Sequence, residues 1–127
     1  MSESNREVEL EVRERRLKVL ETCLGPSIMH YMHDDNVTEV MVNPDGRVWL
    51  DTFDKGFQKT EVIMKVENTK RIIYSIADMS GQVIDLKTDP SLQANIPESR
   101  LFANCRFQAE LPPIVTAPSF NIRKHSK

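Results

Sequence analysis

Two arginines and a lysine near the end of the chain are the residues best suited to chemistry. They lie in the stretch 106–124, RFQAELPPIVTAPSFNIRK, which ends on the basic pair Arg123 and Lys124. A guanidinium presents a planar fork of donors that matches the oxygens of a phosphate, and it stays charged at any physiological pH. We therefore predict an anion site at Arg106 and Arg123, with Lys124 as a secondary candidate.

The pattern around these residues predicts two strands that carry the arginines on their polar faces. Apolar and polar positions alternate from residue 101 to 111, which is typical of a strand with one face on a core. The apolar odd positions are Leu101, Ala103, Cys105, Phe107, Ala109 and Leu111. Arg106 and, by the same alternation around Phe120 and Ile122, Arg123 should point away from the core. Solvated charge without a ligand is equally compatible with this pattern, since arginine is rarely fully buried.

The same stretch resembles a known family. The segment PIVTAPSFNIRK, preceded by an arginine strand and a double proline, is similar to the N-terminal domain of TrbB-type conjugative-transfer ATPases, which are relatives of the hexameric traffic ATPases of type IV secretion. Residues 37–49, VTEVMVNPDGRVW, resemble a hairpin of those domains and stand in the right order. The resemblance covers residues 24–124. The chain differs from the family pattern just before Arg106. The family usually has a glycine and a small residue there, and this chain has Asn104 and Cys105.

The resemblance implies a fold and a role. The fold is a PAS-like α+β domain, and the nucleotide lies between it and a following P-loop domain. Arg106 and Arg123 are the matched positions that would approach the phosphates of ATP, bound with magnesium in the full-length protein. The implied partners are the chain's own P-loop domain, further copies in a hexamer, and proteins of the inner-membrane secretion machinery.

Length and motifs limit what the chain does alone. Its 127 residues suffice for one core but not for this domain plus a complete P-loop domain. None of the four glycines opens a G-x-x-x-x-G-K-[ST] loop. We expect a parent ATPase but an inactive chain, divided into an N-terminal helical segment (1–24), the N-terminal domain of a secretion ATPase (25–124) and the start of a linker (125–127).

The composition argues against nucleic acid as a direct partner. Charged residues make up 28% and the net charge is −2, whereas phosphate-backbone binding requires a basic surface. The two cysteines, Cys23 and Cys105, suit free thiols in a reducing compartment. His30 and His33 are too weak a pattern for a metal site. We expect a cytoplasmic protein, held at the inner membrane through the secretion machine.

The elements that must position the arginines form an α+β domain: an antiparallel sheet of about six strands, with helices on one face, preceded by an N-terminal helix. Helices are expected over residues 5–24, 27–33 and 67–79, with Gly25 and Pro26 separating the first two. The helix over 67–79 carries Ile72, Ile73, Ile76 and Met79 on one face, which should lie on the sheet, and the turn residues 43–46, NPDG, predict a hairpin. The expected strands cover residues 37–43, 47–51, 60–65, 91–96, 101–111 and 119–123. Residues 82–90 form a connecting loop.

The first helix leaves a second function open. One side carries Leu10, Leu17, Leu20 and Leu24, and nearly the opposite side carries Val8, Val12 and Val19. The valines are either scattered surface residues or a contact with a neighbouring subunit. The alternative to an ATPase domain is therefore a free-standing protein-binding or adaptor module of a secretion machine, with no nucleotide role.

Overall fold

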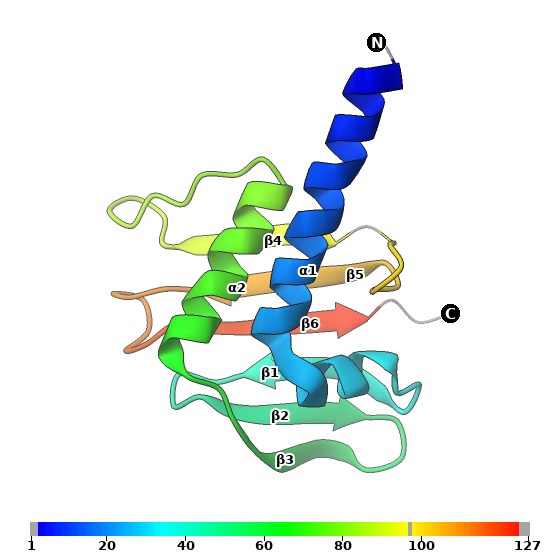
Figure 1. The fold of residues 1–127 in the computed structure, drawn as a ribbon. Helices are drawn as coiled ribbons and strands as arrows, with labels where there is room; N and C mark the ends of the chain where they lie inside the picture. Colours follow the sequence, from blue (N-terminus) through cyan, green and yellow to red (C-terminus); the bar gives the residue numbers. More distant parts are fainter. Residues whose placement is uncertain (1–2, 97, 125–127) are drawn as a thin grey trace.

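A computed structural model describes residues 3–96 and 98–124. These residues form two layers, an antiparallel sheet and a pair of helices that lie across one of its faces (Figure 1). The predicted α+β class, with a six-stranded sheet and an N-terminal helix, is confirmed. The predicted linker at 125–127 lies outside the described residues.

The sheet joins two antiparallel meanders. Its strands are β1 (Val37–Val42), β2 (Arg47–Thr52), β3 (Gly56–Ile63), β4 (Ser91–Ile96), β5 (Cys105–Glu110) and β6 (Ser119–Lys124). Their order is β3-β2-β1-β6-β5-β4, with every neighbouring pair antiparallel. The last three strands were expected as a second antiparallel set, and the β1–β6 pairing merges that set with the first into one sheet.

The β1–β2 turn needs a glycine for two reasons. Gly46 has φ of 86°, a region that residues with a Cβ rarely adopt. A Cβ at this position would also lie 2.5 Å from the carbonyl oxygen of Met64. The backbone of Gly46 in turn accepts a hydrogen bond from the Met64 N–H at 2.8 Å. This turn therefore fixes both the hairpin and the end of β3.

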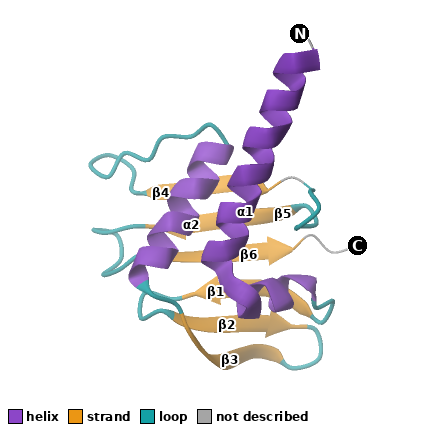
Figure 2. Ribbon diagram, viewed as in Figure 1, coloured by secondary structure: helices purple, strands orange, loops and turns teal. Residues whose placement is uncertain are grey.

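Helix α1 (Glu3–His33) is two helices joined at a kink. Gly25, with φ 80° and ψ 168°, breaks the helical backbone, and Pro26 begins the second part, as the sequence predicts. The buried side of α1 carries Leu17, Leu20, Leu24, Ile28 and Met32. The first turns project beyond the sheet (Figure 2), so Leu10, expected on the buried side, is 57% exposed.

Helix α2 (Val66–Met79) lies beside α1 on the same face of the sheet (Figure 1). The predicted apolar face is confirmed: Ile72, Ile73 and Ile76 are buried, and Met79 packs half-buried against the same core. Both helices therefore cover one side of the sheet, and the other side stays open for a ligand or partner.

Two strands begin elsewhere than expected. The strand predicted over 101–111 begins only at Cys105, because the Ser99 Oγ accepts hydrogen bonds from the N–H groups of Leu101 and Phe102 and folds that segment into a turn. Leu101 and Phe102 are both buried, and Ala103, expected on the core face, is exposed. The third strand begins at 56 rather than 60, since it pairs with β2 from Gly56 onward.

Candidate functional site

The two candidate arginines lie directly opposite each other on neighbouring strands. Arg106 of β5 and Arg123 of β6 are register partners. Their strand neighbours Cys105, Phe107 and Ile122 are buried on the helix side, so both arginines project from the open side of the sheet. Both side chains are exposed. The predicted outward orientation is confirmed, and the fold adds that the two guanidinium groups are adjacent.

Among the residues that the structure describes, no acidic side chain forms an ion pair with either arginine. Within residues 3–96 and 98–124, neither guanidinium makes a hydrogen bond or an ion pair. Side chains directly opposite across antiparallel strands have Cβ atoms about 4.5–5.5 Å apart, and like charges there are destabilising. An anion bridging both groups would relieve that repulsion, and a phosphate could accept from each fork.

Two polar residues that the sequence pattern did not single out border the pair. Glu39 of β1 is the register partner of Arg123 on its other side, and its Oε2 accepts a hydrogen bond of 2.7 Å from the Asn121 Nδ2. Asn95 of β4 lies opposite Arg106. Alternation alone placed Asn121 on the polar face, but only the β1–β6 pairing places Glu39 beside Arg123.

Lys124, the secondary candidate, points away from the arginine pair. It follows Arg123 in β6 and therefore points to the helix side, where its Nζ donates to the carbonyl oxygens of Tyr31 and Asp34, at 2.8 Å each. Desolvation lowers the pKa of Lys124, while the charges of Asp34 and Asp35 oppose that change. The residue links the end of β6 to the end of α1, and its phosphate contact stays a prediction.

The cysteine beside the arginine strand is a core residue. Cys105 is buried, and burial raises the pKa of its thiol to about 11, against the opposing charge of Lys124. Such a thiol is protonated at neutral pH and is a poor nucleophile. Cys23 is half-buried, and both cysteines are free thiols.

A hollow of about 610 Å³ also opens on the uncovered side of the sheet, between its middle strands and the 111–118 connection. Its lining includes the carboxylates of Glu39 and Glu110 and the apolar side chains of Met41 and Ile114, but neither arginine. Carboxylates disfavour an anion, so the hollow is not a continuation of the arginine site.

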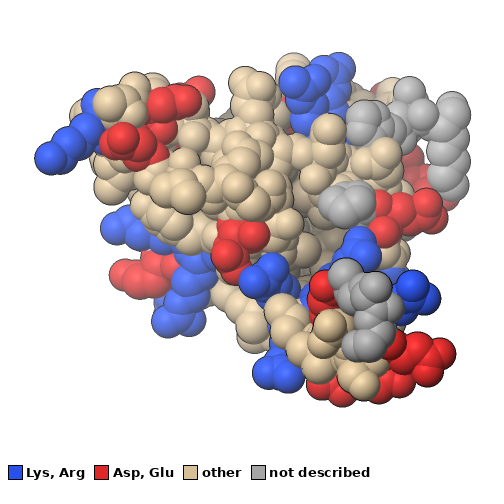
Figure 3. Space-filling model, turned by 90° about the horizontal axis from the view of Figure 1, so that it is seen from above, with Lys and Arg blue, Asp and Glu red and all other residues tan. Residues whose placement is uncertain are grey.

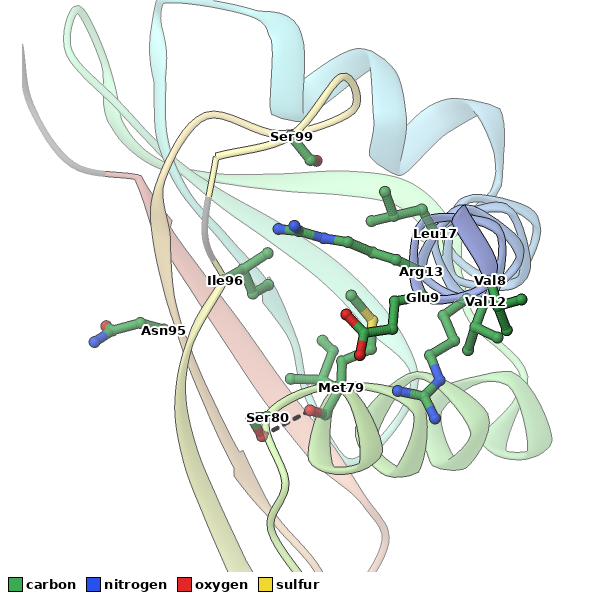
Figure 4. Close-up of a pocket in the computed structure, with 12 residues that line it drawn as sticks. Val8, Glu9, Val12, Arg13, Leu17, Met79, Ser80, Asn95, Ile96 and Ser99 are labelled. Atoms are coloured by element: carbon green, nitrogen blue, oxygen red, sulfur yellow. Dashed lines mark hydrogen bonds between the residues drawn. The ribbon is translucent and has the colours of Figure 1, made fainter. Parts of the chain in front are cut away.

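A second concave surface lies on the other side of the molecule. Figure 4 shows a groove between the first half of α1, the end of α2 and β4, with a volume of about 440 Å³. Val12, Leu17, Ile76 and Met79 supply its apolar lining, and Arg13 extends over it. Seen from above, charges of both signs lie around the rim of the molecule and its middle is largely uncharged (Figure 3).

In the part of the chain that the structure describes, no three His, Cys, Asp or Glu side chains are grouped so as to hold a metal ion. Among the described residues, neither helix combines the length and the apolar character that crossing a bilayer requires.

Sequence and structure comparisons place the chain among known proteins. No protein-family model matches it. It is 28% identical over 112 residues to the probable conjugal transfer protein TrbB of Sinorhizobium fredii (strain NBRC 101917 / NGR234), and 29% identical over 112 residues to the conjugal transfer protein TrbB of Rhizobium radiobacter. Each alignment covers 88% of this chain and 33% of the relative. The chain thus spans about a third of the length of these relatives.

The fold matches a solved structure. The VirB11 ATPase from the Brucella suis type IV secretion system, in complex with sulphate, superposes with a TM-score of 0.71 at 24% identity. The match covers 86% of this chain and 32% of that protein. In sequence the chain is similar to about a third of the TrbB conjugal transfer proteins, and in fold it is similar to a part of the VirB11 ATPase.

Proposed function

We propose that this chain is the non-catalytic N-terminal domain of a hexameric traffic ATPase that powers conjugative transfer or type IV secretion. In this proposal Arg106 and Arg123 contact the phosphates of ATP at the junction with a P-loop domain. The observation that supports it most is the arginine pair itself, which is adjacent, exposed and without an acid partner in the described residues.

The chemistry of such a contact is electrostatic. During phosphoryl transfer, negative charge is distributed over the transferring group and the leaving oxygens, and a positioned guanidinium stabilises that charge. The P-loop domain would supply the backbone cradle and the magnesium site, and this chain would supply two fixed cations.

Assembly is the second part of the proposal. Six copies would form a ring, with the N-terminal half of α1 available for contacts between subunits, because Val8 and Val19 are exposed there. The assembled ATPase would work in the cytoplasm against the inner-membrane proteins of the secretion machine. The names of the TrbB relatives support the setting in conjugal transfer.

The test is ATP turnover by the full-length protein that includes the P-loop domain. Arg106→Ala or Arg123→Ala should lower turnover about ten-fold or more, which corresponds to about 1.4 kcal/mol of transition-state stabilisation. Lysine should restore only part of the rate, since a point charge replaces a two-pronged donor. Arg71→Ala is the matched control, because Arg71 is an exposed arginine on α2, the other side of the molecule.

Two results would contradict this proposal, the first its phosphate-contact role and the second its non-catalytic role. One is full turnover by both alanine variants. The other is ATP hydrolysis by the purified 127-residue chain that disappears on mutation of either arginine, since hydrolysis by this chain alone would make it an enzyme in its own right.

The second candidate function is a protein-binding or adaptor module without a nucleotide role. The apolar groove beside α1 favours it, because Val8 is exposed there and Val12 and Met79 are only half-buried, so that these side chains can contact a partner. The reading frame decides between the two candidates: a P-loop domain directly after Lys127 supports the ATPase, and its absence supports the adaptor.

A further inference from the structure

We propose that Asn121 is a positioning residue that keeps the arginine pair free for phosphate by holding the Glu39 carboxylate away from Arg123. This inference rests on the proposed function, and it concerns how the same site is kept ready. It assigns a role to two residues, Asn121 and Glu39, that need not contact the nucleotide.

The register makes Glu39 the natural ion-pair partner of Arg123. The two residues are directly opposite on β1 and β6, a position from which opposite charges normally attract. A carboxylate there would occupy the same guanidinium fork that a phosphate needs. Yet no ion pair between Glu39 and Arg123 occurs in the described structure.

The carboxylate is instead bound by a neutral group. Asn121 stands two residues before Arg123 on the same face of β6 and is therefore diagonal to Glu39, within reach of long side chains. Its Nδ2 donates to the Glu39 Oε2 at 2.7 Å, and both side chains are half-buried. An amide satisfies the carboxylate without adding a cation, so Arg123 keeps its donors.

The other neighbours of Glu39 reinforce this arrangement. On its β2 side the register partner is Asp51, a carboxylate that cannot donate a hydrogen bond when ionised. Asn121 and Arg123 are therefore the two donors on the β6 side that can reach Glu39. Removing the amide leaves Arg123 as the remaining strong partner, and the arginine pair loses one of its free cations.

The experiment uses NMR on the 127-residue chain at low salt, following the side-chain Nε–Hε resonances of Arg106 and Arg123 with and without inorganic pyrophosphate. The variants are Asn121→Ala, Glu39→Gln and the two combined. Gln108→Ala is the matched control, because Gln108 is the register partner of Asn121 on β5, on the same face, and its side chain forms no hydrogen bond within the described residues.

Asn121→Ala should move the Arg123 resonance before any ligand is added and should weaken pyrophosphate binding about two- to five-fold, the range typical of forming one exposed ion pair. Both effects should vanish when Glu39→Gln is also present, because no carboxylate is left to compete. Gln108→Ala should change neither.

Equal effects of Asn121→Ala with and without Glu39→Gln would overturn the inference, since Asn121 would then contact the anion itself or act only on the fold. An unchanged Arg123 resonance in Asn121→Ala would overturn it as well. The Arg123 resonance without ligand shows whether Glu39 pairs with Arg123, and it does so independently of pyrophosphate binding. If that resonance behaves as expected but pyrophosphate does not bind, the proposed nucleotide contact fails, and the competition between Glu39 and Asn121 for Arg123 stands.

Discussion

Replacing Arg106 with glutamine should make the isolated chain more stable at low salt. Arg106 and Arg123 are directly opposite and unneutralised in the described structure, so each folded molecule holds two like charges together. At a separation of about 6 Å in water, the repulsion amounts to about 0.7 kcal/mol. Removing one charge should recover most of it.

Salt provides the internal test of this magnitude. With a Debye length of about 30 Å at 0.01 M, nearly all of the repulsion persists, about 0.6 kcal/mol, whereas at 1 M the length is about 3 Å and about 0.1 kcal/mol remains. The gain in unfolding free energy of Arg106→Gln should therefore be measurable at low salt and absent at high salt. Residues at binding sites often lower the stability of the fold, so replacing such a residue commonly stabilises the protein at the expense of function.

The assay is urea unfolding of the parent and variant at the two salt concentrations, since urea does not change the ionic strength. Arg71→Gln is the control, because Arg71 is an exposed arginine on α2, on the other side of the sheet. A destabilised Arg106→Gln variant would refute the reasoning, because Arg106 would then have an attractive partner. A gain of the same size at both salt concentrations would also refute it, because the gain would then not come from charge repulsion.

Three other changes test the core, the turn and the buried thiol. Ile76→Asp should unfold the chain, since an unpaired charge replaces a side chain that is 3% exposed, at a cost of several kcal/mol; circular dichroism that still shows a cooperative transition at the parent temperature would contradict the core assignment. Gly46→Ala should lower the free energy of unfolding in urea by about 2–4 kcal/mol, because it combines a positive φ with a Cβ clash against Met64. Gly56→Ala should lower it less, because Gly56 has a positive φ but open space around the position of a Cβ. The raised pKa of Cys105, about 11 against 9.0 in the unfolded chain, stabilises the fold below pH 9. That contribution, about 2–3 kcal/mol, should fade as the pH rises from 9 to 11, and Cys105→Ala should show a shallower decline than the parent over this window.

Local periodicity was sufficient to predict most of the elements. The turn residues of the 43–46 segment predicted the first hairpin, and the spacing of Ile72, Ile73 and Ile76 predicted the buried face of α2, because these signals depend on neighbours within a few positions along the chain. The same alternation placed Arg106 and Arg123 outward. The resemblance to TrbB-type domains added the functional setting, which periodicity does not carry.

The tertiary structure decided what lies beside what. Pairing between β1 and β6 joins residues about 80 positions apart in sequence, and no local pattern contains that register. It is this pairing that sets Glu39 beside Arg123. Lys124 shows the same limit, because only the packed end of α1 shows that its ammonium group donates to the backbone carbonyls of Tyr31 and Asp34. The sequence thus determined which faces are apolar and which are charged, and the long-range strand pairing determined which charges meet.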